Sequence, residues 1–456
     1  MTTTTSRFLD GNFGPVTEEV TAFDLPVTGT VPPELSGRLL RIGPNPITPP
    51  DPAAYHWFMG TGMVHGVALR DGQAEWYRNR WVRDAEVAAA RGIDRPPGDR
   101  AEDGTVNTHV IGIDGRTFAL VEAGSRPMEL SDELETVARS DFGGTLDGSF
   151  SAHTHADPAT GELHAITYHW SWDHVRHVVV GPDARVRREL RVPVEGGPMI
   201  HDCAITERYV VILDLPVAFN LDAAMAGASL PYLWAPDRPP RVGLLPLAGT
   251  ADEVRWFEAP TCYVFHTLNA YDTPDGDVVV DVVRHPRMFD RVTNGPDEGA
   301  AVLERWTVPA GATSSTGRSG SAASAGSAVR VTTLDDRGQE FPRIDDRRTG
   351  RRHRYGYGAV VDALQPGPII KHDLDAGTSE VHSFGPGRSS MEPVFVPRQG
   401  GTAEDDGWLL SYVHDATTGT ADVVILGAQD LTAGPVATVH LPVRVPFGFH
   451  GSWLAD

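Results

Sequence analysis

The chain has 456 residues, of which 40% are hydrophobic and 22% charged, a composition typical of a soluble globular protein with a substantial core. The formal net charge of −22 argues against nucleic-acid binding and against polybasic attachment to anionic lipid, because both need a basic surface. Two cysteines, Cys203 and Cys262, cannot build a disulfide framework, which predicts a reducing, cytoplasmic setting.

The N-terminal residues MTTTTSRFLDGNFGPV contain neither the basic region nor the apolar region of a signal peptide. No apolar run approaches the roughly 20 residues that a membrane-spanning helix needs. We therefore expect a cytoplasmic protein whose contact with a membrane, if it makes any, is peripheral.

In chain order, two segments have a helical pattern, DAEVAAARG at 84–92 and ELSDELETVAR at 129–139. Strand-like runs rich in Val, Ile and Leu, bounded by DG, TG or GP turns, occupy 116–123, 162–170, 174–181, 209–217, 276–284, 407–415, 421–428 and 435–443. The 48 glycines and 36 prolines also favour many short strands. The pattern predicts an all-β protein, with a large sandwich, barrel or propeller as candidates.

One low-complexity segment, PAGATSSTGRSGSAASAGSA at 309–328, is too poor in apolar residues to order itself. We interpret it as a solvated surface insertion, with a mobile lid as the alternative. The strand pattern is alike on both sides, so residues 1–456 are expected to form a single domain.

Among 18 histidines, four have small or apolar neighbours and lie beside strand-like runs: His153, His201, His266 and His450. Their spacings of 48, 65 and 184 residues match no helical or zinc-knuckle motif. They suit metal ligands gathered from separate blades around a propeller axis. On spacing alone, four buried histidines bonded to backbone remain the leading alternative.

From about residue 10 onward the chain contains an ordered series of distinctive fragments: GNFGPV, VTGTVPPELSGRLLRIGPNP, YHWFMGTGMVHGVAL, RNRWVRD, NTHVIGIDGRTFALVEAG, AHTHADPATGEL, MIHDCAIT, FHTLNAY, EFPRID, MEPVFVPR and FGFHGSW. In these fragments, their order and their relative positions, the chain resembles the carotenoid cleavage oxygenase family, which includes carotenoid, apocarotenoid and lignostilbene dioxygenases and the retinal pigment epithelium isomerase.

The resemblance implies a seven-bladed β-propeller with a loop-and-helix dome over an axial metal site. It implies one Fe(2+) per subunit, held by His153, His201, His266 and His450, with O2 as co-substrate. His155, two residues after the first of these, is set aside, because the family pattern places the ligand earlier. Three glutamates are expected to anchor ligand histidines: Glu122, Glu340 and Glu392.

The implied reaction is oxidative cleavage of a C=C bond in a carotenoid- or apocarotenoid-like polyene to two carbonyl products. Stilbene cleavage is an alternative, although Val121 stands where stilbene-cleaving members have a lysine that binds the phenol. A non-oxidative isomerase or hydrolase on the same iron scaffold and a metal-free binding propeller are further alternatives.

The sequence departs from the family pattern at 58–63, FMGTGM, and at 41–45, RIGPN. Neither segment contains an implied iron ligand, so the departures put close substrate similarity in doubt more than metal binding. Candidate dome residues that line a tunnel for the apolar substrate are Phe219, Leu230, Tyr232, Leu233 and Trp234. The last four make the segment 217–236 the best candidate for docking on a membrane. The alternative is that this segment packs inward on the propeller and that the substrate is soluble or delivered by a protein. No protein partner is inferred.

Overall fold

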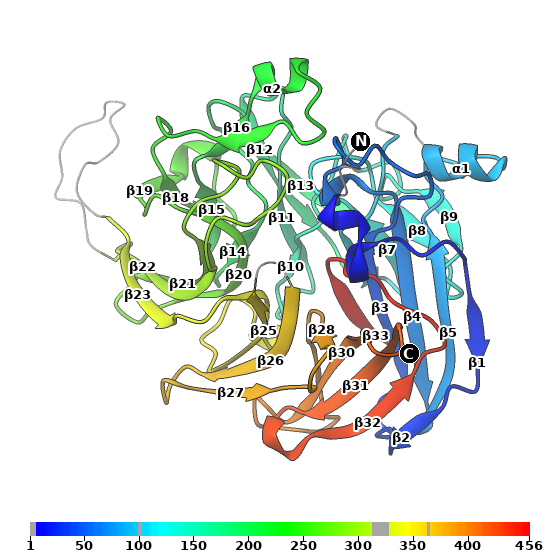
Figure 1. The fold of residues 1–456 in the computed structure, drawn as a ribbon. Coiled ribbons are helices and arrows are strands. Elements are labelled where there is room, and N and C mark those ends of the chain that lie inside the picture. The colour runs from blue at the N-terminus through cyan, green and yellow to red at the C-terminus, as the bar shows by residue number, and fades with distance from the viewer. Residues whose placement is uncertain (1–5, 99–102, 312–327, 363–364) are drawn as a thin grey trace, which may run out of the picture.

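The computed structural model describes residues 6–98, 103–311, 328–362 and 365–456. Seven antiparallel sheets are arranged as blades around a common axis (Figure 1), so the predicted seven-bladed all-β propeller is confirmed. Within the described residues, no helix is both long enough and apolar enough to cross a bilayer.

Blades 2 to 6 each contain four strands, whose order from the axis outward follows the chain. Their strands are β6 (His109–Ile113), β7 (Arg116–Leu120), β8 (Met128–Leu130) and β9 (Thr136–Arg139) in blade 2; β10 (His155–Ala156), β11 (Leu163–Thr167), β12 (His174–Val180) and β13 (Val186–Pro193) in blade 3; β14 (Cys203–Ile205), β15 (Tyr209–Asp214), β18 (Arg241–Pro246) and β19 (Arg255–Glu258) in blade 4; β20 (Tyr263–Asp272), β21 (Val278–His285), β22 (Val302–Val308) and β23 (Arg330–Asp335) in blade 5; and β24 (Gln339–Arg343), β25 (Tyr355–Asp362), β26 (Gln365–Asp373) and β27 (Thr378–His382) in blade 6.

Blades 1 and 7 close the ring with strands from distant parts of the chain. Blade 1 contains β33 (Gly451–Ala455), β3 (Gly37–Pro44), β4 (Gly62–Arg70), β5 (Gln73–Trp81) and β1 (Thr21–Phe23). Blade 7 contains β28 (Arg388–Ser390), β29 (Val394–Pro397), β30 (Gly407–Asp415), β31 (Thr420–Gly427), β32 (Pro435–His440) and β2 (Val27–Gly29). Each closure joins an early strand to a late one by antiparallel pairing.

The blades form because apolar side chains either alternate with polar ones along a strand or occupy nearly all of it. Adjacent sheets bury the apolar faces of these strands against each other. In β30 and β31, for example, nearly every residue is buried. The predicted helix at 84–92 is confirmed as α1 (Ala85–Arg91), which begins at the cap Asp84 and ends at the left-handed Gly92.

The predicted helix at 129–139 is wrong, because β8 and β9 form a hairpin there. Met128 and Leu130 are buried while the residue between them is not, which is the period of a strand. Leu134 has a φ of 69°, a left-handed conformation that no helix interior accommodates. The charge pattern resembles that of a helix, but tertiary packing on the outer edge of blade 2 overrides it.

The low-complexity segment 309–328 connects β22 and β23, which pair as neighbours in blade 5. Residues 312–327 of it lie outside the described part of the chain.

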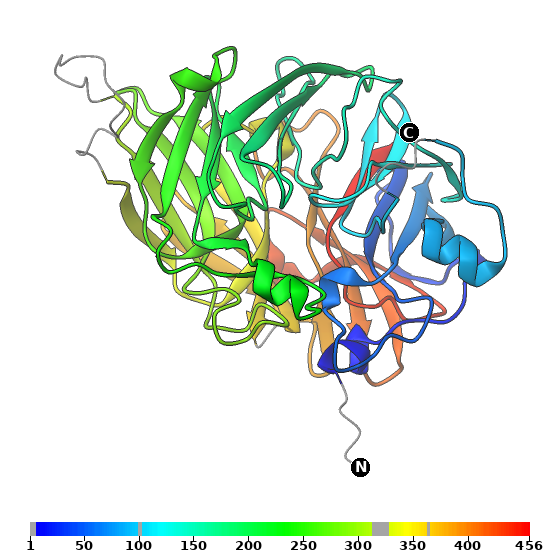
Figure 2. The same cartoon turned by 90° about the horizontal axis from the view of Figure 1, so that it is seen from above.

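A small cap covers one end of the axis. It contains the two-stranded sheet of β16 (Val217–Phe219) and β17 (Tyr232–Trp234), the short helix α2 (Leu221–Met225) and the 3-10 turn η3 (Trp57–Met59). Ser229 after α2 donates a hydrogen bond to the carbonyl of Ala54, which links the cap to the segment before η3; α2 is the green helix in Figure 2.

Candidate metal centre

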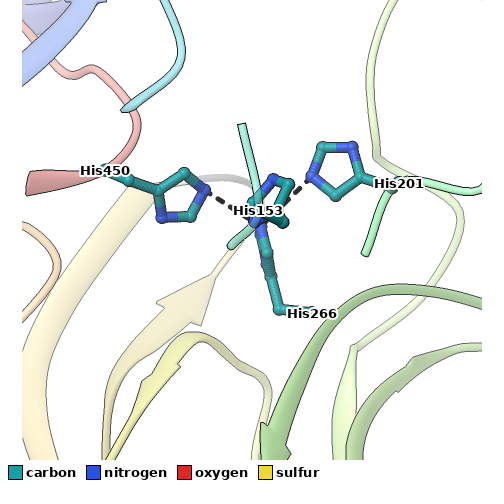
Figure 3. A group of neighbouring side chains, drawn as sticks. All are labelled: His153, His201, His266 and His450. Atoms are coloured by element: carbon teal, nitrogen blue, oxygen red, sulfur yellow. Dashed lines mark hydrogen bonds between the residues drawn. The ribbon is translucent and has the colours of Figure 1, made fainter. Parts of the chain in front are cut away.

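Four buried histidines point toward one another where the innermost strands meet (Figure 3). They are the four that the sequence singles out, His153, His201, His266 and His450, and their ring nitrogens all lie within 4.8 Å of one another. Each comes from a different blade: His153 and His201 lie two residues before β10 and β14 in blades 3 and 4, His450 lies directly before β33 in blade 1, and His266 lies within β20 in blade 5.

Local irregularities of the backbone aim these side chains at the axis. The register of β20 against β21 shifts between Val264 and Thr267, so the intervening Phe265 and His266 leave the regular alternation. His153 lies in a tight turn in which its N–H donates to the Oγ of Ser151. Such bulges re-aim single side chains without breaking the blade.

Three glutamates bond the outer nitrogens of three of these histidines. His201 Nδ1 is 2.5 Å from Glu122 Oε2, His266 Nδ1 is 2.6 Å from Glu340 Oε2, and His450 Nδ1 is 2.8 Å from Glu392 Oε1. The glutamates come from blades 2, 6 and 7, the three blades that contribute none of the four histidines. Among the described residues, no carboxylate bonds to His153.

Each glutamate also has a second partner that the sequence did not single out. Glu122 accepts a short hydrogen bond from the hydroxyl of Tyr168, and Glu340 is 2.6 Å from His285 Nε2. Glu392 accepts from the N–H of Gly451 and lies 3.4 Å from Arg343. The three side-chain partners occupy ordinary strand-end positions, which offer no signal in a single sequence.

Because of these contacts, the inner ring nitrogens of the histidines present lone pairs to which no hydrogen-bond donor is bound. An imidazole that donates from Nδ1 to a carboxylate presents a lone pair at Nε2. The Nε2 atoms of His201 and His266 are 3.3 Å apart, and those of His266 and His450 are 3.1 Å apart. His153 Nε2 is buried without a hydrogen-bond partner. A divalent cation fits this set of donors, since it satisfies all four nitrogens at once.

The electrostatics of His153 and His450 agree with cation binding, whereas at His266 the carboxylate of Glu340 outweighs burial and raises the pKa of the ring. Burial lowers the pKa of His450 to about 3 and that of His153 well below its ordinary value, so both are neutral ligands. Burial opposes ionisation of Glu340 and Glu392, but His266 and Arg343 respectively outweigh it and hold both pKa values far below their usual range. The carboxylates are therefore charged and offset part of a buried positive charge.

His155 does not join the four histidines. Its Nε2 is 2.8 Å from Asp202 Oδ1, and Asp202 in turn accepts from the N–H and hydroxyl of Thr267. A second group that could hold a metal, His155, Asp202 and Cys203, is therefore already hydrogen-bonded internally. Burial also raises the pKa of the Cys203 thiol, which makes it a poor ligand.

An apolar cavity of about 890 Å³ leads to the four-histidine site from the capped end. Three of the proposed dome residues line it, Phe219, Leu230 and Tyr232, as does Val121. Phe58 and Met59, from the segment 58–63 that differs from the family pattern, also line the cavity. The other large apolar lining residues are Trp57, Tyr168, Trp170, Met199, Leu221, Phe265, Phe341 and Phe449.

For Leu230, Tyr232, Leu233 and Trp234 the structure favours the alternative of inward packing over membrane docking. Trp234 is buried, and the other three are half-buried against the core of blades 3 to 5. Tyr232, Leu233 and Trp234 form β17, which pairs with β16. The same segment instead exposes α2, where Leu221 and Met225 are 61% and 80% exposed.

Comparison with known proteins agrees with this geometry. The sequence model of the family described as "Retinal pigment epithelial membrane protein" matches residues 13–455. The chain belongs to the carotenoid cleavage oxygenase family. The "Carotenoid cleavage oxygenase" of Mycobacterium tuberculosis is 43% identical over 98% of this chain and 97% of its own length.

Solved structures of other family members superpose closely. The lignostilbene dioxygenase of Pseudomonas brassicacearum has a TM-score of 0.88 at 26% identity, with 99% of each chain covered. The cobalt-substituted apocarotenoid oxygenase of Synechocystis has a TM-score of 0.85 at 27% identity, with 97% of each chain covered. These carotenoid cleavage oxygenases thus share the propeller over nearly its whole length.

Proposed function

We propose that this protein is a non-haem iron(II) dioxygenase that cleaves one C=C bond of a carotenoid- or apocarotenoid-like polyene and yields two carbonyl products. The observation that carries the proposal is the position of four buried histidines at the end of a large apolar cavity. Both atoms of O2 enter the products, so the two new C=O bonds account for the cleaved double bond without an added reductant.

The residues that would hold the iron are His153, His201, His266 and His450. Iron(II) bound there would activate O2, while the electron-rich alkene itself would supply the electrons for the reaction. Glu122, Glu340 and Glu392 fix the tautomers of three of the rings and offset part of the charge of the ion. The aromatic wall excludes water and aligns an extended apolar substrate.

A polyene fits this cavity better than a phenolic stilbene. Val121 places an apolar side chain beside Glu122 in the wall. Lys371, the chain's one lysine, lies in blade 6, where it forms an ion pair with Asp405, and it does not line the cavity. The structural similarity to a lignostilbene dioxygenase keeps stilbene cleavage as the second candidate.

The test is incubation of the iron-loaded protein with a polyene aldehyde and, separately, with a hydroxylated stilbene under labelled O2. We expect two carbonyl products from the polyene, each containing one labelled oxygen, with slower turnover of the stilbene. Products without label would indicate a hydrolase or isomerase instead. Iron analysis of His153→Ala, His201→Ala, His266→Ala and His450→Ala should show loss of metal, with His155→Ala as the matched control that retains it.

We also propose that the protein takes its substrate from a lipid surface through an apolar rim at the cavity mouth. Met59, Trp170 and Leu221 line the cavity and are 46%, 52% and 61% exposed, and Met225 lies on the same short helix as Leu221. Exposed apolar groups of this kind insert into the membrane interface without any basic charge. The acidic net charge makes such insertion the expected mode of contact.

Liposome flotation at high salt tests this contact. Wild-type protein should float, and Leu221→Asp with Met225→Asp should remain in the soluble fraction. Val137→Asp is the matched control, because Val137 is equally apolar and 46% exposed but lies on β9, outside the cavity lining. Equal flotation of all three proteins would exclude α2 as the docking element.

A further inference from the structure

A second cavity, of about 580 Å³, meets the four-histidine site from the opposite side. The hairpin of β6 and β7 shows the relation of the two cavities. Thr108 and Val121, at the open end of this hairpin, line the apolar cavity, whereas 111–116, at its turn, line the second one. A five-residue strand is about 17 Å long, so the cavities lie at the two ends of the axis.

The two cavities expose different histidines. His201, His266 and His450 line the apolar cavity, and His153, His266 and His450 line the second one. His153 is only 8% exposed, and its Nε2 is buried without a hydrogen-bond partner. The one histidine that lacks a carboxylate partner therefore belongs to the second cavity alone.

The walls of the two cavities differ in chemistry. The apolar cavity is lined mainly by aromatic and aliphatic side chains, with fewer polar groups such as Glu122 and Glu340, whereas carboxylates, amides and hydroxyls make up more of the second cavity: Asp202, Asp345, Asp346, Thr267, Asn269 and Ser452. The arginines there are largely neutralised by ion pairs, such as Arg347 with Asp345 at 2.8 Å and Arg38 with Asp132 at 3.0 Å. The second cavity is thus polar without a strong positive charge.

A divalent cation in water carries a tightly held hydration shell. Moving such an ion through an aromatic cavity strips polar contacts without replacing them, which is costly. Carboxylate and amide oxygens replace water ligands one at a time. Polar groups form a larger share of the wall of the second cavity, which reaches the ring of His153, than of the wall of the apolar cavity.

We propose that the polar cavity, which we call the axial channel, is the route by which the divalent metal enters and leaves the four-histidine site. The apolar cavity then serves the organic substrate alone. This inference rests on the proposed function, because it takes the four histidines as the metal site. It assigns the axial channel a role in metal exchange that is separate from the reaction.

The test measures metal exchange and not turnover. Metal-free protein is prepared with a chelator, Co(II) is added, and bound cobalt is followed over time by rapid desalting and elemental analysis. Ala156→Trp narrows the axial channel, since Ala156 on β10 lines it and is only partly buried. Ala224→Trp is the matched control, because Ala224 on α2 lines the apolar cavity.

We expect Ala156→Trp to take up and release cobalt about tenfold more slowly, with the same final occupancy and the same cobalt absorption spectrum. Ala224→Trp should exchange cobalt at the wild-type rate while it slows cleavage of a polyene. Wild-type exchange in Ala156→Trp, or slow exchange in Ala224→Trp, would overturn the proposal. Failure of the wild-type protein to bind cobalt at all would instead contradict the proposed metal site.

A second measurement needs no variant. An apolar polyene analogue at saturating concentration fills the apolar cavity of the wild-type protein, and cobalt uptake is then repeated. Uptake at the unliganded rate agrees with entry through the axial channel. Uptake that stops when the apolar cavity is filled shows that the metal uses the substrate route, and the inference is then wrong.

Discussion

At the scale of single residues, the three anchoring glutamates differ in what surrounds them. Besides its histidine of the site, Glu122 contacts the phenol of Tyr168. Glu340 contacts the imidazole of His285 through Oε1 and accepts a hydrogen bond from the N–H of Phe341 at Oε2, the oxygen that faces His266. Glu392 contacts the N–H of Gly451 and Arg343. A phenol hydroxyl can turn to accept a hydrogen bond, and a neutral imidazole can do so through its tautomer. A backbone N–H and a guanidinium can only donate.

This difference predicts an order of effects when each glutamate is replaced by glutamine. In Glu392→Gln the amide NH2 must face a fixed donor, so metal affinity should fall towards the upper end of the roughly 10–100-fold range typical of such changes. Glu340→Gln should be intermediate and Glu122→Gln mildest. Chelator competition against bound metal measures the order.

Glu380→Gln is the matched control for this series, because Glu380 is exposed on β27 in blade 6 and should change nothing. Wild-type metal retention in all three variants would show that the glutamates do not act on the site. A larger loss in Glu122→Gln than in Glu392→Gln would contradict the account of their partners.

Much of this site could be predicted from the sequence, because the histidines and glutamates lie in distinctive sequence motifs that match the family pattern. His201 and Glu122 meet in the structure although 79 residues separate them in the chain. Tyr168, His285 and Arg343 could not be predicted in the same way. Their role depends on which strand ends meet at the axis, and spacing along the chain does not encode that.

A buried histidine pair away from the metal site predicts sensitivity to acid. His164 Nδ1 is 3.1 Å from His177 Nε2, and burial lowers their pKa values to about 4 and about 3. In the unfolded chain a histidine titrates near 6.5. The stabilisation is therefore complete above about pH 6.5 and is lost as the pH falls, because the unfolded chain binds protons first.

Each of the two histidines should cost about 2 kcal/mol of unfolding free energy between about pH 7 and about pH 5. Urea denaturation at the two pH values should show a smaller difference for His177→Asn than for the wild type. His440→Asn is the control, since its side chain is 44% exposed and bonds Asp422 at the surface. An unchanged pH dependence in His177→Asn would contradict this account.

At the scale of secondary-structure elements, the approach of two backbones positions one of the histidines. A Cβ atom on Gly43 in β3 would lie 2.4 Å from the Cα of Gly448. Ile42 bonds the backbone of Phe449 and His450 on the same segment. The segment 41–45, which differs from the family pattern, thus contains no histidine of the site but supports the backbone of His450.

Gly43→Ala should therefore push the 448–450 segment away from β3. We expect a loss of about 1–3 kcal/mol in unfolding free energy, as for overpacked cores, together with weaker metal retention. Gly427→Ala in β31 is the matched control, because no atom outside its chain neighbours lies within 4 Å of the added Cβ. Thermal unfolding and metal content of the two variants should differ clearly, and equal values would contradict the prediction.

Most strands could be predicted because their apolar pattern is local in the sequence, whereas features set by contacts with neighbouring elements could not. Runs such as 407–415 and 421–428 are apolar nearly throughout, which suits a strand buried on both faces. The hairpin at 128–139 and the inward packing of 230–234 depend on neighbouring elements. The bulge at His266 likewise follows from how β20 meets β21 and has no local sequence signal.

At the scale of the whole molecule, all seven blades contribute to the site: four give a histidine and three give a glutamate. The geometry at the axis therefore depends on a closed ring. Five residue pairs between β3 and β33, from Arg41 with Gly451 to Gly37 with Ala455, complete blade 1. Gly451 also donates its N–H to Glu392, which links closure directly to the site.

Removal of residues 451–456 should open the ring while leaving His450 in the chain. We expect a lower unfolding midpoint, a broader transition and loss of bound metal, because β3 then has an unpaired edge and Glu392 loses a donor. Removal of Asp456 alone is the control and should leave the metal in place. Full metal content in the longer truncation would show that ring closure does not support the site.

The pairing of β3 with β33 also sets an order of events during synthesis. The ribosome makes β3 early and must add roughly 400 more residues before its partner exists, which takes about 20–80 s at typical rates of translation. Until then the innermost edge of blade 1 is open and the fourth histidine is missing. The nascent chain must hold an incomplete ring for that time, so aggregation or recruitment of a chaperone should concentrate in this interval, before any metal can be bound by all four histidines.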